Sequence, residues 1–351
     1  MLTFIVIPAL IAGIVTGSVL GIKAATRPGP GFFAGLSTAA VDPSGSLYVG
    51  ITDKHQVSRI YRVNQNGALA LFAGNGEKDG GDGGPAVSAG LENVQGLTFD
   101  SGGNAYFFAG GNGNIVHGIR KITPDGVIAT VVGGGTGRPA QGMQAREVSI
   151  DERTGTLIPH VPAIGPNGLL YFSDGGRVWM VGQDGRLALI AGMSQWRDFD
   201  NPPSPDGSPA TEANLSISAI GFDGSGRLLV ADGYRDAHFN SYTMMLRRIE
   251  SDGLIATIYN APSIGRVINF DHIMTDWNGD VILGDGIRVD GGGGDSELPL
   301  SAFQIAGVIA PLREGGYLAT TYDKKAPIIQ VESAGNTRVV CDKNTCHARS
   351  W

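Results

Sequence analysis

Charged side chains are scarce in this chain. They make up 17% of its 351 residues, and the formal net charge is −7, which excludes nucleic acid as a partner because such a surface needs positive charge. Two catalytic patterns are also missing. None of the six histidines has the His-Glu-x-x-His spacing of a zinc site, and no Gly-x-Ser-x-Gly elbow presents a serine nucleophile. The sequence therefore favours a non-enzymatic role.

Cysteine is nearly absent as well. The only two, Cys341 and Cys346, lie in the segment CDKNTCH near the C-terminus. Their proximity predicts a disulfide that staples a small hairpin in an oxidising compartment. The alternative is a rare variant of the c-type haem attachment motif, with His347 as axial ligand. Both interpretations place the C-terminus outside the cytoplasm.

The first 22 residues contain no charged side chain. As a helix, Leu2–Ile22 would span roughly 31 Å, close to the thickness of a bilayer core, so residues 1–22 are predicted to be a transmembrane anchor. A cleaved secretory signal, followed by secretion, is the alternative. Small residues recur every four positions and favour self-association of such helices: Ala9, Gly13, Gly17 and Gly21. Residues 23–34 form a Pro/Gly linker that suits a spacer to a domain outside the cytoplasm.

Glycine, by contrast, is abundant, with 55 residues, and hydrophobic residues reach 42%. From about residue 35 a short apolar run, a turn with glycine and a second apolar run recur six times. The predicted turn glycines are Gly45, Gly102, Gly168, Gly226, Gly279 and Gly315. A second turn follows in most copies, as at Asp125-Gly126 and Asp184-Gly185. Four strands with two turns make an antiparallel blade, which must stack on neighbours to bury both faces.

The sequence therefore predicts an all-β, six-bladed β-propeller over residues 35–340, followed by a Cys-containing tail at 341–351. Solenoid stacking is the alternative, but antiparallel four-stranded units favour a closed ring. In the fifth copy only DGIRVD stands between Gly284 and Gly291. This segment is too short for two ordinary strands and a turn, so blade five is expected to lack one or both outer strands. A five-bladed ring is the second choice.

The second copy reads GLTFDSGGNAYFF, then GIRKITPDGVIATVVGGG, and resembles the repeats of the NHL family. The linker GDGGPAVSAGL at Gly81–Leu91 resembles the inter-blade loop of bacterial NHL proteins and teneurin-like propellers. Weaker copies begin at Gly135, Asp206 and Gly293. The resemblance covers about residues 35–340 and implies the fold, but no single activity, because this fold hosts binders, lyases and lactonases.

In such blades the loops after the second and fourth strands open on one face. The longest predicted insertions, residues 73–86, 191–210 and 232–243, all belong to this loop-rich face. The last two carry side chains typical of binding interfaces: Trp196, Arg197, Tyr234, Arg235, His238 and Phe239. These side chains are the predicted binding residues for a protein or glycan. Alternatively they pack on one another and cap the propeller.

Three aspartates, Asp174, Asp232 and Asp285, are predicted to follow the second strands of blades three, four and five. Together they could hold Ca²⁺ through oxygen ligands, although an Asp before Gly commonly binds its own turn. The leading hypothesis is a membrane-anchored, extracytoplasmic recognition module that requires no cofactor. A calcium-assisted hydrolase or lyase of the lactonase type, with its site in the central channel, and a structural subunit of a surface assembly are the alternatives.

Overall fold

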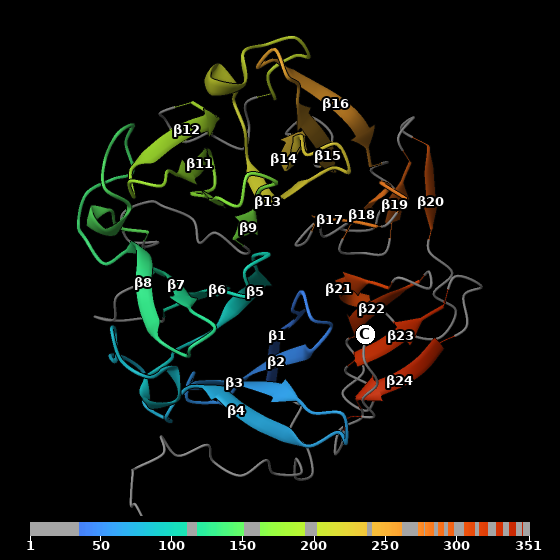
Figure 1. Ribbon diagram of the computed structural model, residues 1–351. Coiled ribbons are helices and arrows are strands. Elements are labelled where there is room, and N and C mark those ends of the chain that lie inside the picture. The colour runs from blue at the N-terminus through green and yellow to red at the C-terminus, as the bar shows by residue number, and fades with distance from the viewer. Residues whose placement is uncertain are drawn as a thin grey trace, which may run out of the picture.

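The computed structural model describes residues 35–110, 118–150, 162–193, 202–236, 241–261, 273–276, 278–283, 287–290, 294–297, 305–312, 316–321, 328–332, 337–341 and 346. These residues form six four-stranded sheets, each built from four consecutive antiparallel strands. The sheets are arranged radially as the blades of a propeller, with the first strand of each blade nearest the axis and the fourth at the rim (Figure 1). The predicted all-β, six-bladed fold is confirmed.

The strands have the following bounds. Blade one contains β1 (Leu36–Val41), β2 (Leu47–Thr52), β3 (Ser58–Val63) and β4 (Leu69–Ala73), and blade two contains β5 (Gln95–Phe99), β6 (Ala105–Ala109), β7 (Gly118–Ile122) and β8 (Ile128–Gly133). Blade three contains β9 (Ala163–Ile164), β10 (Leu170–Ser173), β11 (Val178–Val181) and β12 (Leu187–Ala191), and blade four contains β13 (Ile217–Phe222), β14 (Leu228–Asp236), β15 (Ser241–Ile249) and β16 (Ile255–Asn260). Blade five contains β17 (Ile273–Thr275), β18 (Val281–Leu283), β19 (Ile287–Val289) and β20 (Asp295–Glu297), and blade six contains β21 (Ile305–Pro311), β22 (Tyr317–Thr321), β23 (Ile328–Val331) and β24 (Thr337–Cys341).

In blades one, two, four and five the first turn is closed by an aspartate. In blade one, Asp42 Oδ1 accepts hydrogen bonds from the amides of Ser44 and Ser46, both at 2.9 Å. The turn then needs a residue with positive φ, which Gly45 supplies at 82°. In blade two this role falls to Gly103, with φ 80°, and not to the predicted Gly102. Gly315 lies outside the described residues, and the neighbouring Gly316 has φ 80°.

The predicted linkers between blades repeat, except for the copy that begins at Gly293, in which Asp295–Glu297 forms β20 of blade five. Three of them contain a 3-10 turn that begins with a buried alanine: η2 (Ala86–Ser88), η3 (Ala145–Glu147) and η5 (Ala210–Glu212). Each alanine amide donates to the carbonyl of the second-turn glycine of the next blade, at 2.8 Å from Ala86 to Gly126, for example. The linker therefore runs against the outer strand of the blade that it enters and ties consecutive blades together.

The hydrophobic core lies between blades. Six buried clusters each join two neighbouring sheets; in one of them, Ile60 of blade one packs in the same cluster as Phe107 of blade two. The cluster that closes the ring combines Leu47 of blade one with Leu318 and Val340 of blade six. Since each described sheet contains only consecutive strands, this seam is held by side-chain packing.

Blade five corrects one prediction. It has all four strands, but each is only three residues long. Three residues of the segment DGIRVD form β19, and Val289 pairs with Asp295 of β20. A strand of three residues still forms its ladder, so the short segment does not remove the outer strands. The alternative of a five-bladed ring is wrong for the same reason.

The disulfide between Cys341 and Cys346 is present, as predicted. Both residues are buried at the seam between blades six and one. The second turn of blade one lies directly against this staple, since Gly67 faces the carbonyl of Cys346 with no room for a Cβ. The predicted anchor at residues 1–22 and the linker at 23–34 lie outside the described residues. Within the described ranges, no helix is long and apolar enough to cross a membrane.

Candidate functional site

The predicted binding residues are only partly described. Tyr234 and Arg235 lie in β14, where they pair with Thr243 and Tyr242 of β15. The insertion at residues 232–243 is therefore mostly a lengthened hairpin and not the loop that the sequence predicted. Trp196, Arg197, His238 and Phe239 lie outside the described residues, so their grouping with Tyr234 stays a prediction.

Two of the three predicted calcium ligands are occupied by side chains of the protein. Asp174 follows β10 as predicted, and its Oδ2 accepts hydrogen bonds from Arg177 Nε at 2.8 Å and Trp179 Nε1 at 2.9 Å. Asp232 lies within β14 and not after it; its Oδ1 accepts from the Ser216 amide at 2.8 Å.

The charge of Asp232 is also neutralised from within the protein, because its Oδ2 lies 3.5 Å from Arg247 Nη1. Asp285 lies outside the described residues. In the described part of the chain, no group of three or more His, Cys, Asp or Glu could hold a metal ion. The calcium site stays a prediction. For the haem alternative, both sulfur atoms are already joined to each other, and His347 lies outside the described residues.

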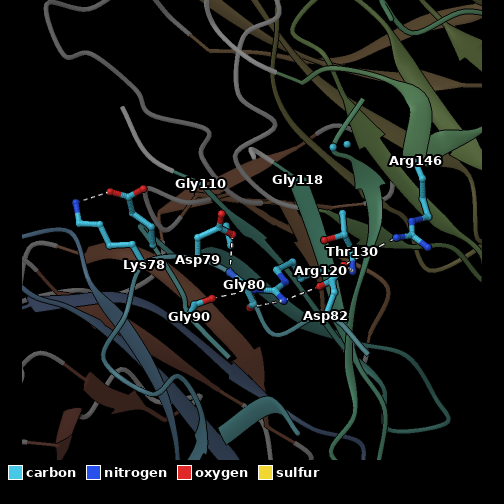
Figure 2. A pocket seen from close by; sticks show the side chains of 14 residues that line it. Lys78, Asp79, Gly80, Asp82, Gly90, Gly110, Gly118, Arg120, Thr130 and Arg146 are labelled. Carbon is cyan, nitrogen blue, oxygen red and sulfur yellow. Dashed lines mark hydrogen bonds and ion pairs between the residues drawn. The ribbon is translucent and has the colours of Figure 1, made fainter. Parts of the chain in front are cut away.

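A cavity of about 290 Å³ opens over blade two, among the ends of β6, β7 and β8 and the linker that enters this blade. In Figure 2, Lys78 and Asp79 lie on one side, Arg146 lies on the other, and Arg120 lies between them. The linker side belongs to the predicted insertion at residues 73–86, on the loop-rich face. This is the candidate functional site, called the blade-two cavity below.

The strand register explains why blade two is hollow at this point. Ala109 of β6 pairs with Gly118 of β7. The matching pair in blade four is Asp232 with Met245, and blade three places Asp174 and Arg177 there, joined by an ion pair of 2.5 Å. Blade two therefore has an alanine and a glycine where its neighbours have large or charged side chains. The missing side chains leave the space.

Arg120 forms the floor of the blade-two cavity. Its guanidinium donates to the carbonyls of Gly90 at 2.9 Å and Gly80 at 3.2 Å, and to Asp82 Oδ1 at 2.6 Å. Blade four repeats this clamp, with Arg247 donating to the Ser204 carbonyl and to Asp206. The clamp fixes the linker on the blade, so this floor is rigid.

Asp82 is held in its charged form. Burial by itself would raise the pKa of this carboxyl group, but hydrogen bonds from Thr130 and the hydrogen bond and charge of Arg120 outweigh it, so the pKa is lowered. The Thr130 amide donates to Asp82 Oδ2 at 2.9 Å. The Asp82 carboxylate is therefore charged at neutral pH and balances the positive charge of the Arg120 guanidinium.

Glu92 is the most unusual residue of the cavity wall. Its side chain is 1% exposed, and Oε1 forms an ion pair of 2.7 Å with Lys78, whose side chain is 42% exposed. The second oxygen, Oε2, has no hydrogen-bond partner among the described residues. A buried carboxylate oxygen that accepts nothing is costly, by about 1–3 kcal/mol or more. Such an oxygen needs an explanation beyond folding, and a ligand donor supplies one.

Sequence reasoning placed the insertion at residues 73–86 correctly but missed Glu92, Arg120 and Ala109. A signal for the cavity does exist. The second strand of blade two reads AYFFAG where blades three and four read LYFSDG and LLVADG, so an alanine replaces the aspartate. The equivalent glycine, Gly118, could be found only from the register between strands, because the segments before it differ in length.

No family model matches the chain. It is 28% identical to mouse teneurin-3 over 241 residues, which are 64% of this chain and 8% of that protein. It is 29% identical to chicken teneurin-1 over 171 residues, 44% of this chain and 6% of the relative. The chain thus spans less than a tenth of either teneurin.

Among solved structures, a catalytically inactive virginiamycin B lyase from Staphylococcus aureus, determined with quinupristin, matches with a TM-score of 0.51 and 15% identity. This match covers 90% of the chain and 85% of that structure. At this identity the likeness shows the β-propeller fold alone.

Proposed function

We propose that this propeller is a recognition module that binds a protein or glycan ligand through its loop-rich face. The observation that carries the proposal is the blade-two cavity, which opens on that face and is lined by Glu92, whose buried Oε2 has no partner among the described residues. A purely structural ring has no use for such a group, because an unpaired buried oxygen only destabilises the fold. Binding a ligand donor gives the oxygen a role.

The rigid surroundings of the cavity support the same proposal. Arg120 is held by three acceptors, and Gly110 donates its amide to the Glu92 carbonyl at 2.9 Å. A fixed floor loses little conformational freedom on binding, which raises affinity for a given set of contacts. The aromatic and arginine side chains of the insertions at residues 191–210 and 232–243 are proposed as further contacts.

The proposed location is the outside of the cytoplasm, with the chain tethered to a membrane through residues 1–22. The disulfide between Cys341 and Cys346 supports an oxidising compartment. An NHL-type repeat is part of the proposal as well, supported by the similarity to the teneurins and by the repeated linker. Residues 23–34 would serve as the spacer that presents the loop-rich face.

The test compares variants on the two faces of the propeller. The full chain would be labelled and applied to a glycan array and to a panel of secreted proteins, and then tested as Trp196→Ala and Tyr234→Ala. A binding hot spot loses about 2 kcal/mol, or roughly 30-fold in affinity, on truncation to alanine. The matched controls, Asp125→Asn and Asp184→Asn, alter second turns on the opposite face and should bind as the unmodified chain does. If the control variants lose binding equally, or the unmodified chain binds nothing, the recognition proposal is wrong.

A further inference from the structure

We infer that the blade-two cavity is a subsite for one neutral saccharide unit, whose hydroxyl groups bind between Glu92 and the two arginines, Arg120 and Arg146. This inference rests on the proposed function and names the chemistry of its ligand. At about 290 Å³ the cavity is at the lower end of the range for ligand pockets, which suits a group the size of a single sugar ring.

Two residues of the cavity wall each have a buried hydrogen-bonding atom without a partner in the described part of the chain, one an acceptor and the other a donor. On the acceptor side stands Glu92 Oε2, and on the donor side Arg120 Nε, and neither has a partner among the described residues. Both side chains are more than nine-tenths buried. A ligand that satisfies them must donate one hydrogen bond and accept another. Adjacent hydroxyl groups do both, because each hydroxyl donates and accepts.

The charge of the cavity favours a neutral ligand. Its wall contains three cationic side chains (Lys78, Arg120 and Arg146) and three anionic ones (Asp79, Asp82 and Glu92). A charged ligand would leave one charge uncompensated in a partly buried site, which is unfavourable. A neutral polyol keeps the balance and takes charge-assisted hydrogen bonds from both ends of the site.

Access to Glu92 is controlled by Lys78. Its side chain is 42% exposed, so its ammonium group can move into water when a sugar hydroxyl takes its place on the carboxylate. Arg146 is 69% exposed and lies 4.0 Å from Asp82, too far for a hydrogen bond, so its guanidinium is available to a ligand oxygen. The floor at Arg120 stays fixed while these two long side chains adapt.

The experiment measures saturation-transfer NMR signals and affinities for free sugars with the full chain, in a detergent without a sugar headgroup. The probes are neutral hexoses and deoxyhexoses (glucose, galactose, mannose, fucose and rhamnose), with glucuronate, glucosamine, free lysine and free arginine for comparison. At least one neutral sugar should bind, and more tightly than the charged probes. Glu92→Gln keeps the shape but removes the charge, and should weaken binding roughly tenfold or more.

Two further variants complete the test. Ala109→Asp restores the carboxylate that blades three and four carry and should fill the cavity, with complete loss of sugar binding. Glu212→Gln removes an exposed carboxylate from the equivalent linker of blade four and should leave sugar affinity unchanged. Failure of every neutral sugar to bind, or tighter binding of lysine or arginine, overturns the inference.

The outcome remains separable from that of the proposed function. If no neutral sugar binds but Trp196→Ala and Tyr234→Ala still impair binding of a protein ligand, the loop-rich face is a recognition surface and only the saccharide subsite is wrong. If Glu92→Gln unfolds the chain, Ala109→Asp still tests the saccharide subsite, because this substitution adds a carboxylate and removes none of the existing polar contacts. Sugar binding that persists in Ala109→Asp places the sugar outside this cavity and refutes the inference.

Discussion

The two linker clamps should differ in what they contribute to stability. Arg247 is 1% exposed and faces Asp232, whose side chain is fully buried. Removing one member of a buried ion pair leaves the other uncompensated and costs about 3–5 kcal/mol. Blade two has Ala109 at the strand position of Asp232, and the ion-pair partner of Arg120, Asp82, is 37% exposed. We therefore expect about 1–3 kcal/mol for Arg120→Met, against about 3–5 kcal/mol for Arg247→Met.

The assay is denaturant unfolding of each variant, in which a shift of the midpoint at constant slope reports stability. Methionine retains the apolar stem, so the difference reports mainly the lost guanidinium contacts. A double variant makes the test more specific. Adding Asp232→Asn to Arg247→Met removes the buried carboxylate that has lost its partner, and should restore part of the lost free energy of unfolding. If Arg120→Met is as destabilising as Arg247→Met, or the double variant recovers nothing, the buried charge of Asp232 is not the reason for the difference.

Four further predictions follow from the sequence and the structure. Deleting residues 1–30 should leave a nearly all-β domain, and a circular dichroism spectrum dominated by helix would contradict this. The full chain should resist carbonate extraction from membranes. The double variant Gly13→Leu and Gly17→Leu should weaken self-association of the chain without abolishing its membrane insertion. A mature N-terminus beyond residue 24 would show a cleaved signal instead. Cys341→Ser should lower the free energy of unfolding by about 2 kcal/mol, measured by denaturant titration, given the short loop that the disulfide closes. The pKa of Asp82 is lowered in the folded protein, so its ionised carboxylate should stabilise the fold fully at pH values above its unfolded pKa of about 3.9. This stabilisation should be lost as the pH falls through the folded pKa, and Asp82→Asn should remove this part of the acid unfolding transition.

The fold was predictable because its signal is local and repeated. Turns such as Asp42–Gly45 are specified within four residues, since the aspartate accepts the turn amides and the glycine takes positive φ. Where two glycines adjoin, as at Gly102 and Gly103, the spacing from the aspartate decides, because Gly103 follows Asp100 by three residues as Gly45 follows Asp42. The choice depends on how Asp100 engages the turn, because its Oδ1 accepts from the Asn104 amide at 2.9 Å.

The site was harder to predict because its defining features are missing side chains. In the sequence, Ala109 and Gly118 look like ordinary small residues. They indicate a cavity only once the strand register shows that they pair with each other. Strand length caused the other errors. The sequence placed Asp232 after its strand, yet the ladder continues to Asp236, because residues 233–236 keep an extended backbone and pair with β15.

The way the ring closes has a consequence for how this molecule can be rearranged. Every described sheet is made of neighbouring strands, and the seam between blades six and one resembles the other five interfaces, apart from the staple at Cys341. New termini could therefore be opened in any inter-blade linker without cutting a sheet, once the original ends were joined. Stability would then be close to a sum over blades and their nearest-neighbour interfaces. Circular permutants opened between blades three and four, for instance, should keep all six sheets intact. By the same reasoning, insertions and deletions in such a ring should be tolerated best as whole blades.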